Sequence, residues 1–123
     1  MRLMMMNLCV AAALLAGSPA FAQTPMGGAK VTADGLNDST GMPLYTFARD
    51  TTPGKSACNG PCATAWPPLT ATTADKDAGD WTVITRDDGG KQWAYKGKPL
   101  YTYAKDTAGQ PATGVSLAWP RAK

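Results

Sequence analysis

The sequence predicts a mainly β protein in which two antiparallel β-meander repeats are related by a pseudo-twofold axis. The first observation is a duplication: residues 41–51 (GMPLYTFARDT) recur as 97–107 (GKPLYTYAKDT), and Ala-Trp-Pro at 65–67 recurs at 118–120. The second is that aromatic residues occupy alternate positions of the duplicated segment, which is the spacing of a strand. The third is composition, because 13 Gly and 10 Pro without any Glu favour strands and turns over helices.

Turn signals divide both repeats into short expected strands. Gly-, Asp- and Asn-containing turns at 37–41, 87–90 and 96–98 interrupt runs with strand spacing. The first repeat is expected to have strands at 29–32, 35–38 and 43–47, and the second at 81–85, 91–95 and 99–103. Both meanders belong to one expected domain at 23–123, with repeats at about 30–70 and 80–123.

The connector between the repeats, residues 58–69 (CNGPCATAWPPL), predicts one short helical turn near its Cys-x-x-x-Cys segment. Pro61 is suited to the first turn of a helix, and Pro67 followed by a second Pro must end it. Trp66 and its counterpart Trp119 both precede Pro, and we expect them to pack at equivalent places in the two repeats, in the core or half-buried beside it. An exposed aromatic platform is the alternative for these two residues.

Residues 1–22 have the three parts of a cleavable signal peptide. Arg2 supplies a positive charge, residues 3–15 form a short apolar run, and residues 20–22 (AFA) match the small-x-small cleavage pattern. We therefore expect cleavage after this tripeptide, a periplasmic or secreted location, and no transmembrane segment in the mature chain. Cys9 lies inside the apolar run, so we expect no lipid attachment.

Composition also excludes several classes of function. The chain has no His, which excludes Ser-His-Asp and Cys-His catalytic arrangements and a Cys-x-x-Cys-His haem site. Its 12 Lys and Arg residues are scattered without a basic run, so nucleic acid is not an expected partner. These features favour a non-enzymatic protein and imply no cofactor.

Cys58 and Cys62 are the two cysteines that follow the signal segment. A disulfide is the default state of such a pair in an exported protein. The alternative is a copper(I) or redox site, because soft thiolates bind copper(I) and Met42 or Met26 could add a thioether. The missing His weakens the copper alternative, and the three intervening residues differ from the two of a thioredoxin-like pair.

The duplicated segments also supply the candidate binding residues, which are Tyr45, Phe47, Asp50, Tyr101, Tyr103 and Asp106. Asp50 and Asp106 each follow an expected strand, so each carboxylate could accept backbone N–H bonds in an Asx-turn. The rival interpretation is a binding surface with one carboxylate from each repeat. Two carboxylates could serve acid–base catalysis or bind calcium, but a glycosidase signature is missing and calcium needs more oxygen ligands.

The segments YTFARD at 45–50 and YTYAKD at 101–106, with Cys-x-x-x-Cys and Trp-Pro-Pro-Leu at 66–69, resemble a bacterial family. It is the secreted repeat of unknown function, also described as predicted lipoproteins with a Yx(FWY)xxD motif. The resemblance covers about residue 30 to the end. It implies export and duplication, but no assigned activity or catalytic residue. Many relatives carry a lipid-attachment cysteine at the cleavage site, and this chain does not.

These observations lead to one interpretation of function. We interpret the chain as an exported envelope module that binds a small ligand or an envelope protein without catalysing a reaction. A copper(I) or redox accessory protein that uses Cys58 and Cys62 is the alternative.

Overall fold

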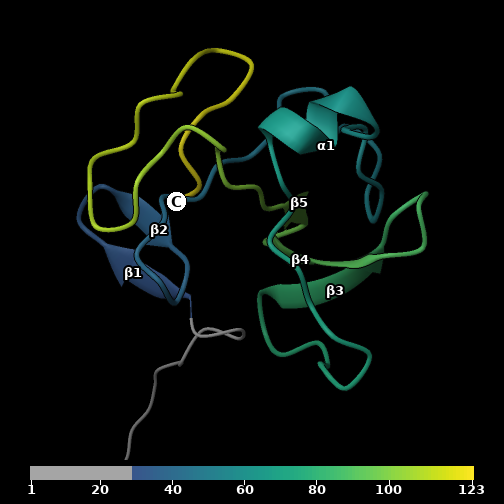
Figure 1. The fold of residues 1–123 in the computed structure, drawn as a ribbon. Coiled ribbons are helices and arrows are strands. Elements are labelled where there is room, and N and C mark those ends of the chain that lie inside the picture. Colours follow the sequence, from purple (N-terminus) through teal and green to yellow (C-terminus); the bar gives the residue numbers. More distant parts are fainter. Residues whose placement is uncertain (1–28) are drawn as a thin grey trace, which may run out of the picture.

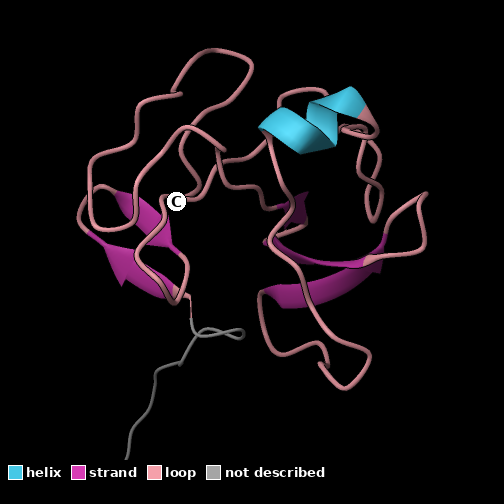
Figure 2. Ribbon diagram, in the orientation of Figure 1, coloured by secondary structure: helices cyan, strands magenta, loops and turns pink. Residues whose placement is uncertain are grey.

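The computed structural model describes residues 29–123, so the expected signal peptide at 1–22 lies outside the described residues. The elements in chain order are β1 (Lys30–Thr32), β2 (Gly35–Asn37), α1 (Pro61–Ala65), β3 (Trp81–Thr85), β4 (Lys91–Tyr95) and β5 (Lys98–Pro99). This part of the chain is mainly β with one five-residue helix, as the sequence predicts (Figures 1 and 2). The helix begins at a proline and ends just before Trp66-Pro67.

The strands form two antiparallel sheets, one in each repeat. β1 pairs with β2 through a two-residue turn, because Thr32 lies opposite Gly35. In the second repeat β3, β4 and β5 follow one another across the sheet, which confirms the predicted meander. Lys96 and Gly97 join β4 to β5, and their φ angles of 52° and 84° are the positive values that a type I′ hairpin turn requires.

The predictions of continuous strands at 43–47 and 99–103 are wrong. In the first segment Pro43 and Tyr45 form only isolated bridges, and in the second β5 ends after two residues. The reason is that successive amides bond to different parts of the chain. The N–H of Leu44 donates to a carbonyl of β2, whereas the N–H of Tyr45 donates to the second repeat. No single neighbour therefore runs alongside either segment.

Each repeat contributes its last segment to the sheet of the other repeat. Ala122, near the end of the second repeat, donates its N–H to Leu44 O and accepts a bond from Leu36 N, both at 2.9 Å. Leu69, its counterpart in the first repeat, makes the same pair of bonds with Leu100 and with β4. The C-terminus accordingly lies beside β2 (Figure 1). The two repeats are intertwined rather than packed side by side.

Gly35 lies where the exchanged segment of the second repeat approaches closest. Its φ angle is 142°, and a Cβ atom on it would lie 2.6 Å from the carbonyl oxygen of Ala122. Real Cβ atoms do not tolerate this distance to backbone, and L side chains rarely adopt this φ. The exchange therefore depends on glycine at this position.

A reciprocal pair of hydrogen bonds marks the pseudo-twofold axis. Tyr45 N donates to Tyr101 O at 2.8 Å, and Tyr101 N donates to Tyr45 O at 2.9 Å. The neighbouring residues Leu44 and Leu100 belong to one hydrophobic cluster, and the two tyrosines belong to a second, aromatic one. The buried members of the first cluster are Ala29, Leu36, Leu44, Trp81, Trp93, Leu100 and Ala122. The Tyr45–Tyr101 backbone pair thus lies between an aliphatic and tryptophan cluster on one side and a mainly aromatic cluster on the other.

Candidate functional site

Four aromatic rings form a continuous stack that crosses the pseudo-twofold axis. Trp66 and Trp119, one from each repeat, stack with ring centroids 4.0 Å apart and planes inclined by 6°. Phe47 stacks on Trp119 at 4.1 Å, and its counterpart Tyr103 stacks on Trp66 at 4.3 Å. The prediction that the two Trp-Pro segments pack at equivalent places is therefore confirmed.

The two motif tyrosines pack edge-on against this stack and are completely buried. Tyr45 meets Trp66 at a centroid distance of 5.0 Å, and Tyr101 meets Trp119 at 5.1 Å. Both tyrosines have 0% exposure. Their rings are parts of the protein core, and a ligand on the surface cannot touch them.

The tyrosine hydroxyls donate to the motif carboxylates across the axis. Tyr45 Oη donates to Asp106 Oδ2 at 2.5 Å, and Tyr101 Oη donates to Asp50 Oδ2 at 2.6 Å. Each motif tyrosine is therefore bonded to the aspartate of the other repeat and not to its own. Two charge-assisted hydrogen bonds join the repeats in this way.

The second oxygen of each carboxylate closes a loop within its own repeat. Asp50 Oδ1 accepts a bond from Ala57 N at 2.6 Å, and Asp106 Oδ1 accepts one from Thr113 N at 2.9 Å. Both bonds span seven residues, whereas the Asx-turn that the sequence suggested would close over two. The aspartates close wide loops at 50–57 and 106–113 and join them to the opposite repeat.

These contacts change the ionisation of the groups involved. Burial, together with the bond to Asp106, raises the pKa of Tyr45 to about 12. The pKa of Tyr101 is also raised, by burial first and then by its bond to Asp50. Burial also raises the pKa of Asp50, although the hydrogen bonds from Tyr101 and Ala57 oppose this shift. The tyrosines stay protonated donors throughout the neutral range.

We expect Asp106→Ala to destabilise the protein by about 2–3 kcal/mol and Asp50→Ala by about 1 kcal/mol, because Asp106 is a buried partner, whereas Asp50 is half-buried and its tyrosine keeps a second partner. Asp106 is buried, and its removal leaves the Tyr45 hydroxyl with only the Gly114 N–H, which donates to it at 3.0 Å. Tyr101 would keep Ser56 Oγ at 2.6 Å. Urea denaturation of both variants measures the two losses. If neither variant loses measurable free energy of unfolding, the carboxylates do not stabilise the fold in this way.

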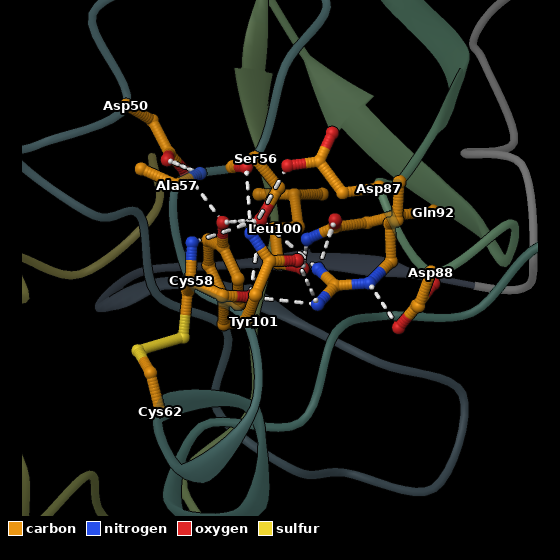
Figure 3. The surroundings of a disulfide bond; sticks show 12 residues. Asp50, Ser56, Ala57, Cys58, Cys62, Asp87, Asp88, Gln92, Leu100 and Tyr101 are labelled. Carbon is orange, nitrogen blue, oxygen red and sulfur yellow. Dashed lines mark hydrogen bonds and ion pairs between the residues drawn. A yellow bond between two sulfur atoms is a disulfide. The ribbon is translucent and has the colours of Figure 1, made fainter.

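A buried arginine of the second repeat extends the network around Asp50. Arg86 is 4% exposed. Its Nη1 donates to Ser56 Oγ at 3.0 Å and to Gln92 Oε1 at 2.9 Å, and its Nη2 donates to Cys58 O at 2.6 Å. Ser56 in turn contacts Tyr101, so the chain of contacts reaches Asp50 (Figure 3). Sequence reasoning missed this residue, because the segment that contains it has only the signals of a turn.

Cys58 and Cys62 form a disulfide across the start of α1, with Cα atoms 5.2 Å apart (Figure 3). Cys58 is buried in the aromatic cluster, and Cys62 packs against it. In this state neither sulfur is a thiolate, so copper(I) binding would first need reduction of the bond. Met42 lies in the turn closed by Asp38, which accepts its N–H at 2.9 Å. Within residues 29–123 no group of three or more His, Cys, Asp or Glu side chains could hold a metal ion.

An open pocket of about 360 Å³ lies beside the loop that Asp50 closes. We call it the Asp50 pocket; its lining residues are Arg49, Asp50, Thr51, Thr52, Lys55, Ser56, Ala57, Asn59 and Asp87. Lys55 and Asp87 form an exposed ion pair there at 2.8 Å. Most of the lining residues carry hydroxyl, amide or charged side chains, and Ala57 is the exception.

The structure brings all six candidate binding residues together but gives them different accessibility. Buried are Tyr45, Tyr101 and Asp106; half-buried are Phe47, Tyr103 and Asp50. Of these six, Asp50 also lines the pocket described above. The buried members join the two repeats.

Comparison with known proteins points to one family. A family model described as a secreted repeat of unknown function matches residues 28–70 and again residues 82–123. Neither the search of curated proteins nor the search of solved structures found a match. In the part of the chain that the structure describes, no helix has the length and apolar character needed to cross a membrane.

Proposed function

Because this chain belongs to the family of secreted repeats of unknown function, we propose that it is an exported, non-enzymatic module that binds a small hydrophilic ligand in the Asp50 pocket. Export follows cleavage of the signal peptide after Ala22, and the mature protein is periplasmic or secreted without a lipid anchor. The family itself brings no activity, so the proposal depends on the geometry of the pocket.

The observation that carries the proposal is the rigid support beneath the Asp50 pocket. Asp50 accepts bonds from Tyr101 and from Ala57, and Ser56 contacts both Tyr101 and the buried Arg86. Side chains held by such a network keep one orientation before a ligand arrives. A site with this preorganisation loses less conformational entropy on binding than a mobile loop does.

The lining groups favour a ligand with many hydroxyl or amide groups. Thr51, Thr52 and Asn59 offer donors and acceptors, and the charges of Lys55 and Asp87 already compensate each other. A volume of about 360 Å³ suits a molecule of the size of a sugar. A soluble carbohydrate is therefore the ligand class with the best chemical match.

The role of Asp50 supports binding rather than catalysis. Both of its carboxylate oxygens accept a hydrogen bond from the protein, one from a tyrosine hydroxyl and one from a backbone amide. A carboxylate used in this way orients a loop, and each of its oxygens already has a protein donor. We therefore propose no reaction for this site.

We expect neutral sugars to bind in the Asp50 pocket, and Thr52→Trp to abolish that binding because the indole fills the pocket. The probes are glucose, N-acetylglucosamine and their disaccharides, titrated into the disulfide-bonded protein and followed by amide NMR. Saturable shifts should be confined to the loop at 49–57 and to the turn around Asp87. Ala108→Trp is the matched control, because Ala108 is the exposed counterpart of Thr52 in the second repeat. Binding of none of these sugars, or equal loss in both variants, would refute the proposal.

A further inference from the structure

A second pocket, of about 270 Å³, is lined by an unusual concentration of positive charge. Lys96 and Lys98 come from the β4–β5 hairpin, and Arg121 and Lys123 come from the exchanged C-terminal segment. We call this site the lysine pocket. It shares no lining residue with the Asp50 pocket, and its apolar lining includes the buried residues Leu100 and Ala122.

The three lysines of the lysine pocket have no acidic side chain beside them in its lining. No Asp is among its lining residues. In the part of the chain that the structure describes, the two ion pairs are Lys55–Asp87 and Arg86–Asp88, and both lie elsewhere. Like charges gathered in one hollow raise the local concentration of anions.

Arg121 lines this pocket, but its guanidinium bonds to residues that do not line it. Its Nη1 donates to Leu36 O at 2.7 Å and to Leu44 O at 2.9 Å, and its Nη2 donates to Asn37 Oδ1 at 3.2 Å. All three acceptors are neutral. Burial lowers the pKa of Arg121, although more distant carboxylates such as that of Asp34 act in the opposite direction. The positive charge that faces the lysine pocket therefore comes from its lysine side chains.

Lys96 stands at a position where lysine is conformationally unfavourable. Its φ angle of 52° is the one positive value among the non-glycine residues at 29–123. Type I′ turns prefer Asn, Asp or Gly at this position, because other L side chains are strained there. The Lys96 ammonium lies 5.1 Å from the centroid of the Tyr95 ring, which also lines the pocket. A strained residue that presents a charge at a pocket points to a function for that charge.

We propose that the lysine pocket binds a phosphate group. A phosphate monoester carries nearly two negative charges at neutral pH and offers three acceptor oxygens, which suits several lysine ammonium groups better than a single carboxylate does. Lys96, Lys98 and Lys123, which line the pocket, supply flexible donors. The apolar lining leaves room for the organic part of the ligand. This site is additional to the Asp50 pocket and does not depend on it.

The test titrates inorganic phosphate into the disulfide-bonded protein at constant ionic strength, with amide NMR as the readout. Saturable shifts are expected at the hairpin around Lys96 and at the C-terminal segment. Lys98→Glu combined with Lys123→Glu should weaken binding about tenfold or more, because two attractive charges become repulsive. The control combines Lys76→Glu with Lys105→Glu, which changes the net charge equally at exposed lysines outside the pocket.

Lys96→Asn separates a ligand-binding role from a structural one. Asn accepts the left-handed backbone conformation, so the variant should melt at the same temperature as the wild type or higher. Its affinity for phosphate should nevertheless fall, by about threefold for one exposed charge. Unchanged affinity in this variant would overturn the role assigned to Lys96.

Vesicles distinguish the two sources of a phosphate group. The protein is sedimented with phosphatidylcholine vesicles that do or do not contain phosphatidic acid. Binding to the phosphatidic acid vesicles alone assigns the site to a lipid headgroup, and binding of free phosphate alone assigns it to a soluble ligand. The proposal is overturned if neither binds, or if the control pair of substitutions weakens binding as much as the pocket pair.

Discussion

Separated halves of this chain are expected to remain unfolded by themselves and to regain structure when mixed. The fragments are 23–73 and 74–123, and the cut lies in the largely exposed loop before β3. The first fragment lacks Ala122, which bonds to Leu44 and to β2, and the second lacks Leu69. Each is also shorter than the roughly 60 residues at which a single domain becomes marginal.

The fragments also lose half of every interaction that crosses the axis. Trp66 is left without Trp119, and Tyr45 without Asp106. Each fragment alone should show the narrow amide dispersion of an unfolded chain, and an equimolar mixture should give the spectrum of the intact protein. The control is the intact protein cleaved at an inserted protease site in the same loop, which should stay folded. A stable native-like spectrum from either fragment alone would contradict the intertwined architecture.

β3 and β4 were accessible to sequence reasoning, because a strong turn signal at 87–90 lies between two short runs that contain β-branched and aromatic residues. The exchange was not. Leu69 and Ala122 occupy equivalent sequence positions, and each could pair with its own repeat or with the other one. A single strand would make equivalent hydrogen bonds and bury equivalent side chains whether it paired with its own repeat or with the other one. Which of the two pairings forms depends on packing in the whole core, and no local sequence pattern indicates it.

The candidate site was likewise predicted only in part from the sequence. The duplication predicted that Tyr45 and Tyr101, and likewise Asp50 and Asp106, would be equivalent. It did not indicate that each tyrosine bonds to the aspartate of the other repeat. The lysine pocket was invisible for a similar reason, because its cations come from two short segments that only the exchange brings together. The scattered positions of the lysines in the sequence thus did not predict that the fold would bring them together.

Trp119→Ala is expected to lower the free energy of unfolding by about 3–5 kcal/mol, the range for deletion of a buried tryptophan. Trp119 is 8% exposed, stacks between Trp66 and Phe47, and packs against the edge of Tyr101. Alanine removes three aromatic contacts and leaves a cavity at the pseudo-twofold axis. Small domains have total stabilities of roughly 5–15 kcal/mol, so the variant should be close to unfolded at physiological temperature.

Two further variants identify the cause of this loss. Trp119→Phe keeps a ring between Trp66 and Phe47, and it should recover a large part of the stability. Leu117→Ala is the control, because Leu117 lies two residues away and is 98% exposed, so its loss should stay within about 0.5 kcal/mol. Urea denaturation followed by far-ultraviolet circular dichroism measures all three variants. A loss below about 1 kcal/mol for Trp119→Ala would mean that the stacked rings are not the contact that holds the repeats together, whereas the expected loss would show that the Trp-Pro segments stabilise the fold mainly by meeting each other across the axis.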